Sequence, residues 1–190
     1  YVGYRYYETF NIPTSYEFGY GLSYTNFEYS NIQLDTDTIG NIKVCVTLKN
    51  IGRKTGKEIV QLYISAPTTE IDKPLYELKA FAKTTLLKPQ ENQIVSFLLS
   101  AKDLASFQSG ISSWVADKGE YILSIGASVK DIRQKVSFHL PSSILVEKVH
   151  DVLYPNFSIK DMNSASRKVL KEIPPKRPTK RIPHDFLWHW

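Results

Sequence analysis

The fold class of this 190-residue chain is decided by residues 42–49, which read Ile42-Lys43-Val44-Cys45-Val46-Thr47-Leu48-Lys49. Apolar and polar side chains alternate there with a period of two, the pattern of a β-strand with one face against a core. The pattern returns at residues 60–64 after a loop that contains Gly52 and Gly56. These two runs predict a sheet that buries one face.

Five further runs have the character of strands, and they cover residues 27–34, 76–84, 93–100, 120–127 and 133–140. Turn-forming residues separate them: Pro67, Pro74, Pro89, Gly110 and Gly119. Seven short strands within about 110 residues match the size of an immunoglobulin or fibronectin type III sandwich. Only residues 101–109 leave room for a helical turn, and long helices do not alternate with the strands, which disfavours a βαβ fold. We predict an all-β, immunoglobulin/fibronectin type III-like sandwich of about seven strands.

A tyrosine corner is predicted near residue 120. Gly119 forms a turn after Asp117, and Tyr121 follows at the start of a strand, where its hydroxyl can donate to backbone upstream and hold the crossover between two sheets. Trp114 is expected in the core or between the sheets. The alternative interpretation is that Tyr121 is an ordinary aromatic residue of a strand.

Composition divides the chain into three parts. Residues 1–30 contain 8 of the 12 tyrosines, whereas four prolines and many basic residues lie close together near the C-terminus. We predict an interdomain docking segment at 1–26, which ends a preceding catalytic-region domain, a sandwich at 27–141, and a poorly structured basic extension at 142–190.

The net charge of +5 is concentrated in the last part of the chain. Residues 1–150 carry 16 Lys and Arg against 15 Asp and Glu, and residues 151–190 carry 8 against 4. A nearly neutral body lacks the basic surface that nucleic acid requires, so no nucleic-acid partner is expected. No apolar run approaches the roughly 20 residues of a membrane-spanning helix.

No residue is assigned to catalysis, to a cofactor or to a metal. Glu17 lies among aromatic residues and could be one of the two carboxylates that glycoside hydrolysis needs. The sequence identifies no second carboxylate that would act with it. Cys45 lies within a strand, where a cysteine is usually a small packing residue, so its pairing with His139 is disfavoured. As the single cysteine, Cys45 also excludes an intrachain disulfide. His184 and His189 alone make a poor metal site.

The aromatic residues at the start of the chain are the main functional signal. They are too numerous for a free loop, since each buries about 150–250 Å² when it is covered. They pack on the sandwich or on another domain, or form a platform for sugars, and we favour packing. The docking residues we predict are Tyr4, Arg5, Tyr6, Phe18, Tyr20 and Tyr24.

Several motifs resemble glycoside hydrolase family 3. The end of that family's second catalytic-region domain is similar to Tyr1-Val2-Gly3-Tyr4-Arg5-Tyr6-Tyr7 and to Tyr16-Glu17-Phe18-Gly19-Tyr20-Gly21-Leu22-Ser23-Tyr24-Thr25-Asn26-Phe27. The family's C-terminal fibronectin type III-like domain is similar to Lys54-Thr55-Gly56-Lys57-Glu58-Ile59-Val60-Gln61-Leu62-Tyr63-Ile64-Ser65-Ala66-Pro67, and to residues 73–81, 114–121 and 126–133. The resemblance covers about 1–140, and more loosely extends to about 160.

The resemblance implies a parent enzyme that hydrolyses terminal β-D-glucosides or β-xylosides with retention, by an aspartate nucleophile and a glutamate acid. No Asp in this sequence precedes Trp or Tyr, so the nucleophile motif is absent, and we expect no activity from this chain alone. The expected partners are the catalytic domains of the same parent chain, and it is those domains that would bind the β-linked substrate. Tyr1 is expected to be an internal or processed start, and the family favours a periplasmic or secreted protein. The alternative is an independent sandwich that binds carbohydrate or protein.

Overall fold

The computed structural model describes residues 1–37, 41–69 and 71–149, and residues 1–150 form one compact unit. Most of the predicted C-terminal extension therefore lies outside the described residues. The elements in chain order are α1 (Tyr4–Thr9), β1 (Phe27–Thr36), β2 (Ile42–Asn50), β3 (Ile59–Ser65), β4 (Glu77–Lys83), β5 (Asn92–Leu99), α2 (Ala101–Leu104), β6 (Ser106–Gln108), η1 (Ser109–Ile111), β7 (Ser113–Ala116), β8 (Gly119–Gly126), β9 (Ile132–Leu140) and β10 (Ile144–Lys148).

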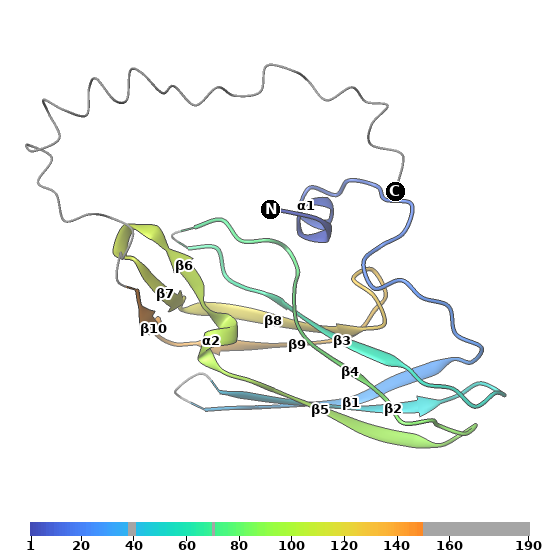
Figure 1. Ribbon diagram of the computed structural model, residues 1–190. Coiled ribbons are helices and arrows are strands. Elements are labelled where there is room, and N and C mark those ends of the chain that lie inside the picture. Colours follow the sequence, from blue (N-terminus) through green and yellow to red (C-terminus); the bar gives the residue numbers. More distant parts are fainter. Residues whose placement is uncertain (38–40, 70, 150–190) are drawn as a thin grey trace, which may run out of the picture. The chain divides into compact units, whose positions relative to one another are not determined.

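Two antiparallel sheets build the sandwich, in the strand orders β1-β2-β5 and β4-β3-β8-β9 (Figure 1). The predicted all-β fold is confirmed, and a strand lies in each of the seven predicted runs. The structure adds a small sheet in the order β10-β7-β6, whose strands of 3 to 5 residues are too short for a clear alternation.

The core is formed by the alternating residues of both sheets. Val44, Val46 and Leu48 of β2 are fully buried, and they face Leu123 and Ile125 of β8 in the same hydrophobic cluster. The strand that motivated the fold prediction thus lies at the centre of its sheet, between β1 and β5.

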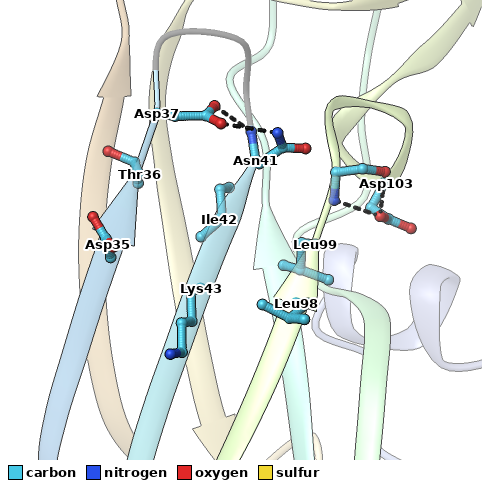
Figure 2. Close-up of a pocket in the computed structure, with 10 residues that line it drawn as sticks. Asp35, Thr36, Asp37, Asn41, Ile42, Lys43, Leu98, Leu99 and Asp103 are labelled. Atoms are coloured by element: carbon cyan, nitrogen blue, oxygen red, sulfur yellow. Dashed lines mark hydrogen bonds between the residues drawn. The ribbon is translucent and has the colours of Figure 1, made fainter.

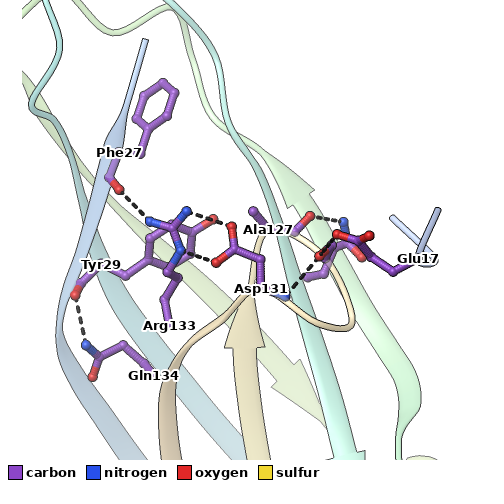
Figure 3. Close-up of polar contacts among 9 residues, drawn as sticks. Glu17, Phe27, Tyr29, Ala127, Asp131, Arg133 and Gln134 are labelled. Carbon is purple, nitrogen blue, oxygen red and sulfur yellow. Dashed lines mark hydrogen bonds and ion pairs between the residues drawn. The ribbon is translucent and has the colours of Figure 1, made fainter. Parts of the chain in front are cut away.

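Side chains of β9 close one side of the sandwich by binding the backbone of β1. Arg133 donates from Nη1 to the carbonyl oxygen of Phe27 at 3.1 Å, and Gln134 donates from Nε2 to that of Tyr29 at 2.9 Å (Figure 3). The two sheets are therefore joined along this side by polar bonds as well as by the core.

The segment before β8 has the geometry of a tyrosine corner. The hydroxyl of Tyr121 is buried and donates to the Asp117 carbonyl oxygen at 2.8 Å, and burial raises the pKa of this hydroxyl. Gly119 has a φ of 134°, which favours glycine, and a Cβ there would press on the ring of Pro67. The Asp117 carboxylate binds Lys73 at 2.6 Å in a buried ion pair.

The small sheet corrects the expected place of Trp114. This side chain is 39% exposed on β7, where it packs against Phe107 of β6 with ring centroids 5.5 Å apart, so the prediction of a core residue is wrong. The side chains of Ser113, Val115 and Ala116 are the buried ones on this strand. Because β10 pairs with β7, the ordered chain also continues past residue 141.

We expect Tyr121→Phe to lower the free energy of unfolding by about 1–1.5 kcal/mol, because it removes one buried hydrogen bond and leaves the ring in place. Denaturant unfolding of both proteins measures the difference. Tyr24→Phe is the control, since Tyr24 is almost fully exposed. A loss within about 0.3 kcal/mol of that control would show that the corner bond adds no stability.

Candidate interdomain surface

The central strand β3 is buried on both faces. Val60, Leu62 and Ile64 face the core, while Gln61 and Tyr63 point to the outer side of the sheet and are nevertheless buried. Residues of the N-terminal segment, 1–26, contact both of them. This segment therefore forms one body with the sandwich.

Aromatic contacts attach the segment to the sheet. The rings of Tyr4 and Phe18 are stacked, with centroids 4.3 Å apart, and Tyr4 meets the edge of Tyr63 at 6.2 Å. Tyr63 in turn makes an edge contact with Tyr76 at 6.2 Å. Such tilted and offset pairs are favourable beyond the area that they bury.

Side chains of α1 bind the outer edge of the sheet near β4. The hydroxyl of Tyr4 accepts from the backbone N–H of Leu78 at 2.8 Å, and the hydroxyl of Thr9 accepts from that of Leu75 at 2.9 Å. Arg5 forms an ion pair with Glu77 at 3.1 Å. Tyr4 and Arg5 are thus engaged with the sandwich.

A buried polar network joins the segment to the β8–β9 turn. Tyr63 donates from its hydroxyl to Oε1 of Gln61 at 2.5 Å, and Gln61 donates from Nε2 to the carbonyl oxygens of Ala127 at 2.5 Å and Gly19 at 3.4 Å. Burial raises the pKa of the Tyr63 hydroxyl, which stays protonated as this donor. Gly19 has a φ of 84°, and a Cβ there would overlap the Gln61 amide. This position therefore requires glycine.

Two further bonds extend this attachment. The backbone N–H of Val129 donates to the carbonyl oxygen of Phe18 at 3.0 Å, and Ser128 donates from its hydroxyl to Glu17 at 3.0 Å. The same hydroxyl accepts from the backbone N–H of Asp131 (Figure 3). The Glu17 carboxylate thus accepts a hydrogen bond from the turn and helps to hold it.

Asp131 and Arg133 form a two-bond ion pair beside this network, at 2.5 and 2.6 Å. The hydrogen bond with Arg133 holds the pKa of Asp131 below its usual range, whereas burial raises the pKa of nearby Glu58. Both carboxylates line a hollow of about 470 Å³ that also touches Tyr20 and Leu22. Because Arg133 compensates the charge of Asp131, the Asp131–Arg133 ion pair has a structural role beside the network.

The six predicted docking residues divide into two groups. Tyr4, Arg5 and Phe18 contact the sandwich or one another as described above, although Arg5 and Phe18 are also exposed on one side. Tyr6, Tyr20 and Tyr24 are exposed, and Tyr24 is 97% exposed. Sequence reasoning missed exposed apolar residues next to them, above all Val2, Tyr16 and Leu22. No periodicity identifies these residues, because none of them lies in a helix or a strand.

A second hollow, of about 460 Å³, lies at the end of β1 and β2 and carries acidic residues (Figure 2). Asp37 accepts from the backbone and amide of Asn41 at 2.8 Å each, and Asp103 caps α2 through Ser100 at 2.8 Å. These two carboxylates serve local turns. Within the described part of the chain, no group of three or more His, Cys, Asp or Glu side chains could hold a metal ion. No helix of that part is long and apolar enough to cross a membrane.

Comparison with known proteins agrees with this architecture. Residues 58–129 match the fibronectin type III-like domain family. Thermostable beta-glucosidase B of Acetivibrio thermocellus is 39% identical over 182 residues, which are 91% of this chain and 24% of that protein. Beta-glucosidase BoGH3A of Bacteroides ovatus is 42% identical over 140 residues, 72% of this chain and 19% of its own length.

Solved structures give the same result. The structure of beta-glucosidase 3B from Thermotoga neapolitana in complex with α-D-glucose has a TM-score of 0.74 and 46% identity, over 77% of this chain and 20% of that one. The sandwich is thus a fibronectin type III-like domain. The chain matches the C-terminal region of β-glucosidases of glycoside hydrolase family 3, which confirms the resemblance seen in the sequence. It spans a quarter or less of the length of these relatives.

We expect Gln61→Leu to lower the free energy of unfolding by about 1–3 kcal/mol, because the buried hydroxyl of Tyr63 and the carbonyl oxygen of Ala127 lose their partner. Urea unfolding measures this loss, and chymotrypsin should cut within residues 10–24 faster than in the parent chain. Gln33→Leu is the matched control on an exposed position of β1. Equal effects of the two variants would contradict a special role for the Gln61 network.

Proposed function

We propose that this chain is the non-catalytic, C-terminal fibronectin type III-like part of a family 3 glycoside hydrolase, and that it stabilises the catalytic domains by packing against them. The observation that carries the proposal is that the N-terminal segment, residues 1–26, binds the sandwich with one side and exposes apolar residues on the other. One side is bonded to the sheet through Tyr4, Phe18 and Gly19, and the other exposes Tyr20, Leu22 and Tyr24.

Exposed apolar residues that are concentrated in one segment usually mark an interaction surface. Here residues 4–19 of the segment are bonded to β3, β4 and the β8–β9 turn, so its backbone is already ordered before a partner binds. This preorganisation lowers the entropic cost of docking. The residues proposed for docking are Tyr6, Tyr20, Leu22 and Tyr24, while Tyr4, Arg5 and Phe18 bind the segment to the sandwich.

For the whole protein we propose hydrolysis of terminal β-D-glucosides, or of β-xylosides, by a retaining mechanism in carbohydrate metabolism. Matched proteins that are called β-glucosidases, and a glucose-bound structure among the structural relatives, support this class of substrate. Retention requires two carboxyl groups about 5–5.5 Å apart. In the proposal, these groups belong to the catalytic domains.

An independent carbohydrate-binding sandwich is the second candidate. It is favoured by the half-exposed ring pair of Phe107 and Trp114, since sugars bind by stacking on such rings. The bonded N-terminal segment favours domain packing instead. Sugar affinity of the purified chain distinguishes the two functions.

The purified 190-residue chain is expected to hydrolyse no aryl β-glucoside above the rate of buffer, because loss of a catalytic group costs several orders of magnitude in rate. Release of nitrophenol from the corresponding glucoside and xyloside is the measurement. Turnover that Glu17→Gln abolishes would contradict the proposal and make Glu17 a catalytic residue.

The exposed residues of the segment are expected to bind a hydrophobic dye, and the triple change Tyr20→Ser, Leu22→Ser and Tyr24→Ser should remove most of the signal. Dye fluorescence is the measurement, and Phe81→Ser is the control at another exposed apolar residue. Calorimetry with glucose and cello-oligosaccharides should show no binding. Millimolar or tighter sugar affinity that disappears with Tyr20→Ala or Trp114→Ala would support the binding module instead.

A further inference from the structure

Strands β1, β5, β4 and β9 are the outer strands of the two main sheets. The outer side of such a strand presents backbone N–H and C=O groups that can pair with another chain. Proteins normally protect these groups with charges, prolines, bulges or covering segments. The protection of the four strands differs in this molecule.

Three of the outer strands are protected. Side chains of β9 bind carbonyl oxygens of β1, so these two strands shield each other. The edge at β4 is covered by α1 through Tyr4 and Thr9, and Lys79 and Lys83 add charge. Strand β1 also has an irregular register between Ser30 and Gln33. Each of these features discourages pairing with a second chain.

Strand β5 has no charge, proline or bulge, although β4 approaches it. Its sequence, Asn92-Gln93-Ile94-Val95-Ser96-Phe97-Leu98-Leu99, contains no charge, no proline and no glycine. Its pairing with β2 is regular from end to end. Within the described residues, Thr85 donates to the Gln93 side chain at 2.9 Å near the start of the strand, and no side chain is seen to bind the β5 backbone from its outer side.

The outer face of β5 is apolar, unlike that of its neighbour. Ile94 is 66% exposed and Leu98 is 78% exposed, with Ser96 between them. The residues of β2 opposite these three are Thr47, Lys43 and Cys45. The exposed apolar side chains are therefore confined to the outermost strand. The outward side chains of a strand that paired with β5 would pack beside them.

We propose that β5 is a self-association edge, at which two copies of this chain pair their β5 strands antiparallel about a two-fold axis. Outward residues carry even numbers, so the register has to place even residues opposite even residues. Two such registers lie nearest the centre of the strand, and we take the one that puts Ser96 opposite Ser96 of the second copy, because it pairs the two large outward side chains. Ile94 then lies opposite Leu98 of the second copy, and Val95 opposite Phe97.

This arrangement is self-complementary in its chemistry. An isologous two-fold contact uses the same surface twice, and β5 brings no charge that would repel its own copy. On either side of the central Ser96 pair, Ile94 meets Leu98 on the outer face and Val95 meets Phe97 on the core side, and apolar cross-strand pairs of this kind stabilise sheets. A single strand pair makes a small contact, so the association is weak and concentration-dependent.

Sedimentation equilibrium of the full chain up to about 100 µM tests the proposal, with a monomer–dimer equilibrium as the expected result. Leu98→Lys places a charge on the edge and should raise the dimer dissociation constant at least about tenfold. Phe81→Lys is the control, because Phe81 is equally exposed on the protected β4 and should change little. Thermal unfolding by circular dichroism verifies that both variants fold.

Cross-linking tests the register independently. Cys45 lies 3.4 Å from Ser96, so Cys45→Ser is made first to remove the competing thiol. In that background Ser96→Cys should form a disulfide-linked dimer on mild oxidation, whereas Lys43→Cys, one strand further in, should remain monomeric. A chain that stays monomeric at every concentration overturns the proposal. A dimer that persists in Leu98→Lys but is lost with Tyr24→Ser also overturns it, because association then occurs through the N-terminal segment.

Discussion

The fold of the first 150 residues depends on a buried polar contact on the outside of a sheet. Gln61 and Tyr63 point away from the core, and such side chains would ordinarily reach water. They are buried here because residues 4–19 cover them, and the cost of removing them from water is offset by the bonds to each other and to the β8–β9 turn. The cover, the central strand and the turn therefore form one unit, although they come from three distant parts of the sequence.

In the function proposed above, this unit gives a fibronectin type III-like sandwich a packing role, while the catalytic groups belong to other domains. The sheet provides a rigid base, and the N-terminal segment converts one of its faces into an irregular surface with exposed tyrosines. In the relatives, a domain of this kind occupies a quarter or less of the chain. A surface fixed on one side by hydrogen bonds suits permanent contact within one polypeptide, where the effective concentration of the partner is high.

Much of the fold followed from the sequence because the strands obey a simple period. The alternation around Val44 and Val46 predicted one buried face and is confirmed, and the turn residues separated the seven strands. The failures have physical reasons. Trp114 lies in a strand of four residues, in which alternation has little meaning, and Tyr63 is buried by a segment that only the tertiary structure brings to it. The division of the aromatic residues into inward and outward groups depends on hydrogen bonds such as that between Tyr4 and Leu78, which no local pattern encodes.

The position of the cover along the chain also has a consequence for the order of folding. Residues 4–19 leave the ribosome before the sandwich strands that they contact, and their bonds with Ser128 and Val129 span more than 100 residues. Such distant contacts form late, since the loop between them must close first. Helix α1 has only six residues and is too short to persist alone. The tyrosine-rich segment therefore gains its structure only after the β8–β9 turn exists, so the last strands of the sandwich have to be made before the first residues of this chain can pack.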